Sequence, residues 1–192
     1  MQWPAVVSAD RNIEMSDHHP ESAADVLRAR LRELYSSIDK RAGELSVVHA
    51  GRLRCGAGCC DCCVDDITVF TVEADNIRSL HRDLLATGTP HPAGACAFLD
   101  NNGECRIYDA RPYVCRTQGL PLHWIEEADD GTTVAMRDIC PGNDDGIPVE
   151  ELDESDCWII GPAEEELAKL HYKSSGGKMV RCGLRDLFSG NG

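Results

Sequence analysis

The sequence predicts a small, irregular α+β domain with several helices and one β-hairpin. Apolar residues recur at helical spacing in three stretches, at 21–52, 72–86 and 162–172. Two short segments of strand-forming residues flank the turn 127–131, a pattern typical of a β-hairpin. The segment 53–66 shows neither period and is dense in cysteine, so the middle of the chain needs another source of order.

Composition indicates what that source is. The chain has 192 residues, of which 42% are apolar by a count that includes 11 cysteines. Without the cysteines the apolar share is roughly 36%, below the usual share of about 45–50%. Metal bound by thiolates contributes its binding energy to folding. We therefore expect a metal-nucleated domain.

The cysteine count also bears on the compartment. No apolar run approaches the length of a membrane span, and the N-terminus lacks a basic stretch followed by an apolar one. These features predict a cytoplasmic protein with no membrane partner. In a reducing cytosol, many cysteines indicate metal ligation or redox chemistry, and an odd total argues against a fully paired disulfide scaffold.

Negative charge is concentrated in one segment. The chain carries 19 Lys and Arg against 33 Asp and Glu, a formal charge of -14. Residues 126–166 hold fifteen of the acids and one base, so they account for the whole imbalance. Such a surface repels phosphate backbones, and we expect no nucleic-acid partner. The acidic face serves solubility or, alternatively, docks an unknown basic protein partner.

The first part of the chain divides into a tail and a helix. Residues 1–20 are polar, contain two prolines and predict a flexible N-terminal tail. Residues 21–52 predict an N-terminal amphipathic helix that ends at Gly51. Its buried stripe consists of Leu27, Leu31, Leu34, Ile38 and Leu45.

Three further elements are expected in the middle of the chain. A second helix is predicted over 72–86, with Thr71 as its N-cap and Ile77, Leu80, Leu84 and Leu85 inward. A short helix opens at Asp109, after a loop at 90–103. A hairpin then pairs 122–126 with 132–138.

The last segment, 143–192, is predicted to be an acidic loop and a C-terminal helix packed on the same domain. Pro162 opens this helix, and three glutamates follow in its first turn, where the helix dipole favours them. The connections between the predicted elements are too short to indicate a second domain.

The densest cysteine cluster lies between Cys55 and Cys63. Two C-x2-C pairs interleave there, Cys59 with Cys62 and Cys60 with Cys63. Two intervening residues allow a tight turn to aim both thiolates at one ion. This spacing predicts metal ligation.

A second set of cysteines lies between residues 96 and 115. Cys96 and Cys105 flank a turn at Asn102-Gly103, and Cys115 falls on the predicted short helix. Arginines lie close to the cysteines in sequence, and guanidinium groups suit the neighbourhood of anionic thiolates. They are Arg52, Arg54, Arg106, Arg111 and Arg116.

The combined pattern resembles a known family. The order Cys55-x3-Cys59-x2-Cys62-Cys63, then Cys96, then Gly103-x-Cys105-x-Ile107-Tyr108-x-x-Arg111-Pro112-x-x-Cys115-Arg116, then Cys140-Pro141-Gly142, is similar to the CxxCxxCC family of zinc- or iron-chelating proteins, also called YkgJ-like cysteine cluster proteins. The resemblance covers residues 53–142 and implies a cysteine-cluster metal-binding domain there. The ligands it implies are Cys55, Cys59, Cys62, Cys63, Cys96, Cys105, Cys115 and Cys140.

The identity of the metal stays open at this point. Eight thiolates suit two zinc sites, two iron–sulfur clusters or one of each. Cys55-x4-Cys60-x2-Cys63 also coincides with a plant-ferredoxin spacing, so Cys60 competes with a ligand of the implied set. We expect Cys157 to be a buried apolar residue and Cys182 to be an accessory thiol or a cysteine without a metal role.

Two classes of function follow. The first is a metal-binding protein that holds zinc or iron, the iron alone or in an iron–sulfur cluster, with no catalytic residues. The alternative is an enzyme, either a cluster-containing oxidoreductase or a relative of flagellin lysine N-methylase, whose cysteine motif is related. The sequence contains no P-loop, no G-x-G-x-x-G loop and no H-E-x-x-H motif, which favours the first class.

Overall fold

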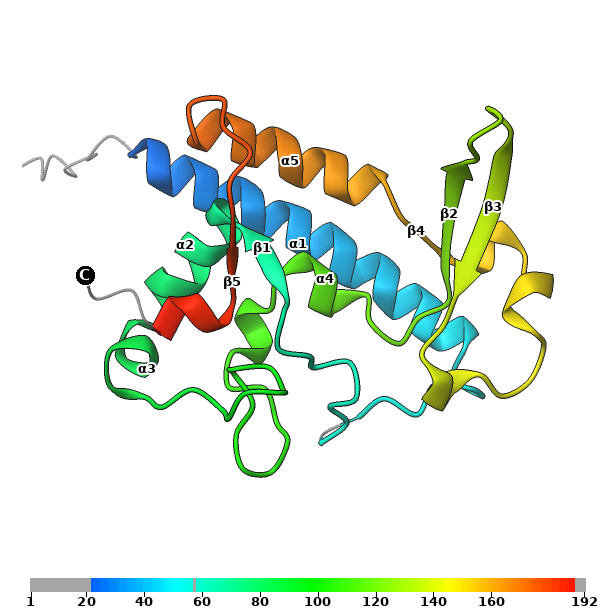
Figure 1. The fold of residues 1–192 in the computed structure, drawn as a ribbon, viewed down its shortest axis with the longest axis horizontal. Coiled ribbons are helices and arrows are strands. Elements are labelled where there is room, and N and C mark those ends of the chain that lie inside the picture. The colour runs from blue at the N-terminus through cyan, green and yellow to red at the C-terminus, as the bar shows by residue number, and fades with distance from the viewer. Residues whose placement is uncertain (1–21, 57, 189–192) are drawn as a thin grey trace, which may run out of the picture.

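The computed structural model describes residues 22–56 and 58–188. It is an α+β fold in which the long helix α1 packs against α5, α4 and α2 (Figure 1). The predicted flexible tail at 1–20 lies outside the described residues. The helices are α1 Ala23–Val48, α2 Thr71–Leu80, α3 Arg82–Thr87, α4 Tyr113–Arg116 and α5 Pro162–Ser174. The strands are β1 Thr68–Phe70, β2 Leu122–Glu127, β3 Thr133–Asp138, β4 Trp158–Ile159 and β5 Arg181–Gly183.

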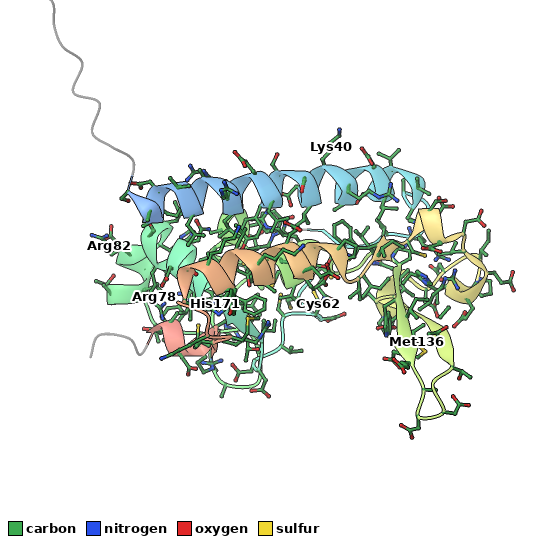
Figure 2. The ribbon with its side chains drawn as sticks, turned by 90° about the horizontal axis from the view of Figure 1, so that it is seen from above. Lys40, Cys62, Arg78, Arg82, Met136 and His171 are labelled. Carbon is green, nitrogen blue, oxygen red and sulfur yellow. The ribbon has the colours of Figure 1, made fainter. Side chains whose placement is uncertain are left out.

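The N-terminal helix forms as the sequence predicts. Ser22 caps α1 and exchanges hydrogen bonds with Asp25, which satisfies N–H groups that the first turn leaves free. Leu31, Ile38 and Leu45 are buried as expected, and Tyr35 joins them on the same stripe. α5 lies alongside α1 (Figures 1 and 2), and together they form one hydrophobic cluster.

The predicted second helix is two helices. The backbone breaks at His81, between α2 and α3, yet Leu84 and Leu85 are partly buried against the same hydrophobic cluster as Ile77. Leu80 is exposed rather than buried. Thr71 is the first helical residue rather than the cap; instead, the Glu73 side chain accepts a hydrogen bond from the Phe70 N–H, 3.2 Å away.

The hairpin is confirmed, and the structure adds two strand pairings that the sequence did not predict. β2 and β3 pair antiparallel with Trp124 opposite Met136, and the hairpin projects from the body of the molecule (Figure 2). β4 extends this sheet by parallel pairing with β2. β1 pairs antiparallel with β5, which brings the C-terminal segment back against the segment that follows the cysteine-dense loop.

The helix expected at Asp109 is also divided. A 3₁₀ turn at Tyr108–Ala110 precedes α4, and Pro112 separates them. None of the described helices is both long and apolar enough to cross a membrane.

Candidate metal centre

One cavity gathers most of the predicted ligands. It measures about 920 Å³ and lies between one face of α1 and the loops that carry the cysteines. α1 presents small side chains to it, among them Ala42, Gly43 and Ser46. Seven of the eight predicted ligand cysteines line it: Cys55, Cys59, Cys62, Cys63, Cys96, Cys105 and Cys115.

The eighth, Cys140, is tied to this group through Asn143. The Asn143 backbone N–H donates to the Cys140 carbonyl (2.7 Å), and its side-chain amide donates to the Cys55 sulfur (3.2 Å). The pKa of Cys55 is raised, chiefly by burial and further by the neighbouring thiols, Cys140 among them. Cys140 therefore lies within electrostatic range of Cys55.

Asn143 also fixes the loops on either side. It is 1% exposed, its side-chain oxygen accepts from the Arg54 N–H (2.7 Å), and its amide donates to the Gly119 carbonyl (2.8 Å). Gly119 has a φ of 89°, and a Cβ there would lie 2.5 Å from the Cys55 sulfur. The close approach of these loops requires glycine at that position.

A backbone hydrogen bond joins the two cysteine segments. The Cys96 N–H donates to the Cys63 carbonyl over 2.8 Å. Arg185 supports both segments, since its guanidinium binds the Asp65 carboxylate and donates to the Ala95 carbonyl (2.8 Å). Arg185, on the C-terminal 3₁₀ turn, thus fixes the two cysteine segments relative to each other.

Cys105 lies opposite Leu99 in an isolated β-bridge, and this bridge closes the turn at Gly103 that the sequence predicts. The adjacent Arg106 N–H donates to the Phe98 carbonyl (2.9 Å). Cys96 and Cys105 therefore lie on the two segments that flank one short loop.

Cys115 is positioned by α4 and by the arginine that follows it. Arg116 donates to the carbonyls of Arg111 (2.8 Å) and Asp109 (2.9 Å) and pairs with Asp39 of α1 (2.6 Å). Burial, followed by the charges of Cys96 and Cys105, raises the pKa of Cys115 to about 12.

The thiols of Cys62 and Cys63, which are neighbours in the chain, act on each other. The pKa of Cys62 is lowered and that of Cys63 is raised, chiefly by their mutual interaction. The pair thus favours one thiolate and one thiol.

The three remaining cysteines lie elsewhere. Cys60 is not among the described residues that line the cavity. It packs, close to Gly103, against a second hydrophobic cluster that includes Ile77, Phe98 and Ile107. Cys157 is 1% exposed, as expected for a buried apolar residue. Cys182 lies on β5, opposite Val69.

The arginines near the cysteines act mainly on backbone carbonyls. Arg52, Arg106 and Arg116 donate to carbonyl oxygens of neighbouring loops, which is a positioning role that sequence proximity to the thiols did not predict. Arg111 differs. It lines the cavity, its guanidinium lies 3.7 Å above the Tyr108 ring, and its buried Nε–H has no partner among the described residues.

The donor set and this unpartnered N–H fit a thiolate-bound metal. Soft thiolate ligands select zinc and iron–sulfur centres, and such sulfurs accept N–H donors from nearby side chains. Arg111 supplies a free donor and a positive charge, which opposes the burial that raises the pKa of Cys105 and Cys115.

The thiols surround the cavity without converging. Within residues 22–56 and 58–188, no three His, Cys, Asp or Glu side chains lie close enough to hold one ion. Cys55 and Cys59 are exposed, whereas Cys96 is buried. Binding one ion would therefore require cysteine side chains to move closer together.

Comparison with known proteins agrees with the resemblance seen in the sequence. Residues 54–141 match the model of the CxxCxxCC family, which is described as a putative zinc- or iron-chelating domain. The matched segment contains all eight predicted ligands. No curated protein and no solved structure gives a significant match to the chain.

Proposed function

From the match of residues 54–141 to a zinc- or iron-chelating domain, we propose that this protein binds zinc or iron through eight cysteines. They are Cys55, Cys59, Cys62, Cys63, Cys96, Cys105, Cys115 and Cys140. The observation that supports this most directly is the single cavity lined by seven of those cysteines, although they come from segments far apart in the chain. Cysteines that served only as small apolar core residues would not be expected to line one cavity together.

The chemistry expected at this site is structural or electron-transferring. A full set of thiolate ligands leaves a zinc ion no open position for water, which suits structural sites rather than hydrolysis. An iron–sulfur cluster held by cysteines would instead carry electrons. Arg111 would supply the N–H donor and charge beside either group.

The test is elemental analysis, with an absorption spectrum, of protein purified without oxygen. We expect zinc in a colourless protein, or iron and sulfide in a coloured one. Cys182→Ser serves as the control because Cys182 lies on β5, outside the described cavity lining, and this variant should retain the wild-type metal content. Protein that holds neither metal, and takes up neither after anaerobic reconstitution, contradicts the proposal.

A further inference from the structure

The eight cysteines are not equivalent, because the contacts of their loops separate them into two groups. We propose that each group forms its own four-thiolate metal centre, an inference that rests on the proposed function. The first group is Cys55, Cys59, Cys62 and Cys140, and the second is Cys63, Cys96, Cys105 and Cys115.

The first group is held together by the loop 55–62 and by Asn143. The Cys59 N–H donates to the Gly56 carbonyl (3.1 Å), which closes a turn between Cys55 and Cys59. Asn143 hydrogen-bonds both the Cys55 sulfur and the Cys140 carbonyl. Cys140 is thereby attached to the first group although it is remote in sequence, and no comparable contact ties it to Cys96 or Cys105 among the described residues.

The second group is connected by backbone contacts in series. The Cys96 N–H binds the Cys63 carbonyl, the Leu99 N–H binds the Cys96 carbonyl (3.1 Å), and Leu99 bridges to Cys105. Cys115, on α4, lines the same cavity as these three cysteines and completes the set of four. Cys63, Cys96 and Cys105 also belong to, or pack against, the same hydrophobic cluster.

The division falls between the neighbours Cys62 and Cys63. A C-x2-C pair aims two thiolates at one ion, and two such pairs compete in this loop. Cys60 is not among the described residues that line the cavity, which leaves Cys59 with Cys62 as the pair on the cavity wall. Cys63 is then free to join Cys96, to which its backbone is already bonded. Because Cys62 and Cys63 are consecutive residues, the two centres adjoin.

The test uses cadmium-113 as a probe for thiolate sites that take zinc. Wild-type protein should bind two Cd²⁺ per chain and give two NMR signals in the region of thiolate coordination. Cys140→Ser should remove or shift one signal, and Cys96→Ser should remove or shift the other, each with loss of about half the bound cadmium. Cys182→Ser should leave both signals in place.

Two results overturn the division. The first is a single Cd²⁺ per chain, and the second is that Cys140→Ser and Cys96→Ser change the same signal. Either result leaves the proposed metal-binding function intact. Failure of the protein to take up cadmium, zinc or iron at all overturns both proposals, so the two failures are distinguishable.

A measurement on the wild type guards against variants that do not fold. The protein is titrated with Cd²⁺ and alkylated at each step, and the protected cysteines are identified by peptide mass spectrometry. Cys55, Cys59, Cys62 and Cys140 should gain protection along one curve, and the second group along another, while Cys60 and Cys182 stay reactive. A cysteine of one group that follows the curve of the other overturns the division.

Discussion

Asn143 holds together three loops that the cysteine pattern leaves separate. Its side chain binds the Arg54 N–H, the Gly119 carbonyl and the Cys55 sulfur, and it is almost fully buried. An unpaired buried polar group costs more than a typical hydrogen bond contributes. The residue after Cys140-Pro141-Gly142 is therefore as important to the site's geometry as the cysteines near it.

Asn143→Ala should lower the free energy of unfolding of the metal-free protein by about 3 kcal/mol, because it leaves the Arg54 N–H and the Gly119 carbonyl without partners. Chemical denaturation measures this change. Asn101→Ala, at an exposed position, is the matched control and should stay within about 0.5 kcal/mol of wild type. Equal stability of the two variants would contradict the bridging role.

Sequence reasoning could find the cysteines but not the side chains that position them. The cysteine spacing carries a direct chemical meaning, since two intervening residues suit a metal turn. Asn143 and Arg185 carry no such signal, because each binds groups from segments distant in sequence. Likewise, the sequence left the choice between Cys60 and Cys63 open, because they differ only in the three-dimensional structure, where Cys63 lines the cavity and Cys60 is not among its lining residues.

At the scale of elements, local pattern predicted α1, α5 and the hairpin well, placed single helices at 72–86 and at Asp109 where the structure is divided, and did not predict the short strands. α1, α5 and the β2–β3 hairpin have long apolar patterns and clear end signals. β4 has two residues and depends on parallel pairing with β2, so its own sequence carries too little pattern. The break at His81 was missed because Leu80, Leu84 and Leu85 keep helical spacing across it.

Glu73 links three helices through one buried carboxyl group. It lies on α2 and accepts hydrogen bonds from the Tyr35 hydroxyl of α1 (3.0 Å) and from the Tyr113 N–H at the start of α4 (2.8 Å). Burial raises its pKa above the usual 4.5, although these bonds and the nearby Arg181 charge oppose that shift. The folded state thus retains a proton at pH values where the unfolded chain has lost it.

This shift gives the Glu73 contribution to stability a definite sign. The contribution is fully present below pH 4.5, the unfolded-state value, and is lost as the pH rises through the folded-state pKa. In Glu73→Gln this part of the pH dependence should disappear. Denaturation series between pH 4 and pH 8 measure it, with the exposed Glu33→Gln as control. If Glu73→Gln keeps the wild-type pH profile, the assignment is wrong.

At the scale of the whole molecule, the fold has two hydrophobic clusters that depend on the cysteines to different degrees. The first packs α1 against α5 with Tyr113 and Trp158, and none of its members is a cysteine. The second includes Cys96, with Cys63 and Cys105 packed against it. Metal bound by these thiols would stabilise the second cluster directly and the first only through their connections.

Removal of metal should therefore loosen the molecule unevenly. After treatment with a strong chelator, amide hydrogen exchange should rise most at 54–66 and 95–107, while α1 and α5 keep most of their protection. Exchange followed by mass spectrometry measures this, with the metal-loaded protein as reference. An equal rise in α1 would show that the two clusters unfold as one unit, and no rise anywhere would show that metal contributes little to folding.

The hydrogen bond from Asn143 to Cys55 spans 88 positions in the chain, and this separation orders events during synthesis. Cys63, Cys96, Cys105 and Cys115 all leave the ribosome before Asn143 does. At roughly 5–20 residues per second, the interval between Cys115 and Asn143 lasts about 1 to 6 s. If Cys55, Cys59 and Cys62 form the proposed centre with Cys140, that centre can be completed only after this interval, and the centre of Cys63, Cys96, Cys105 and Cys115 can form before it.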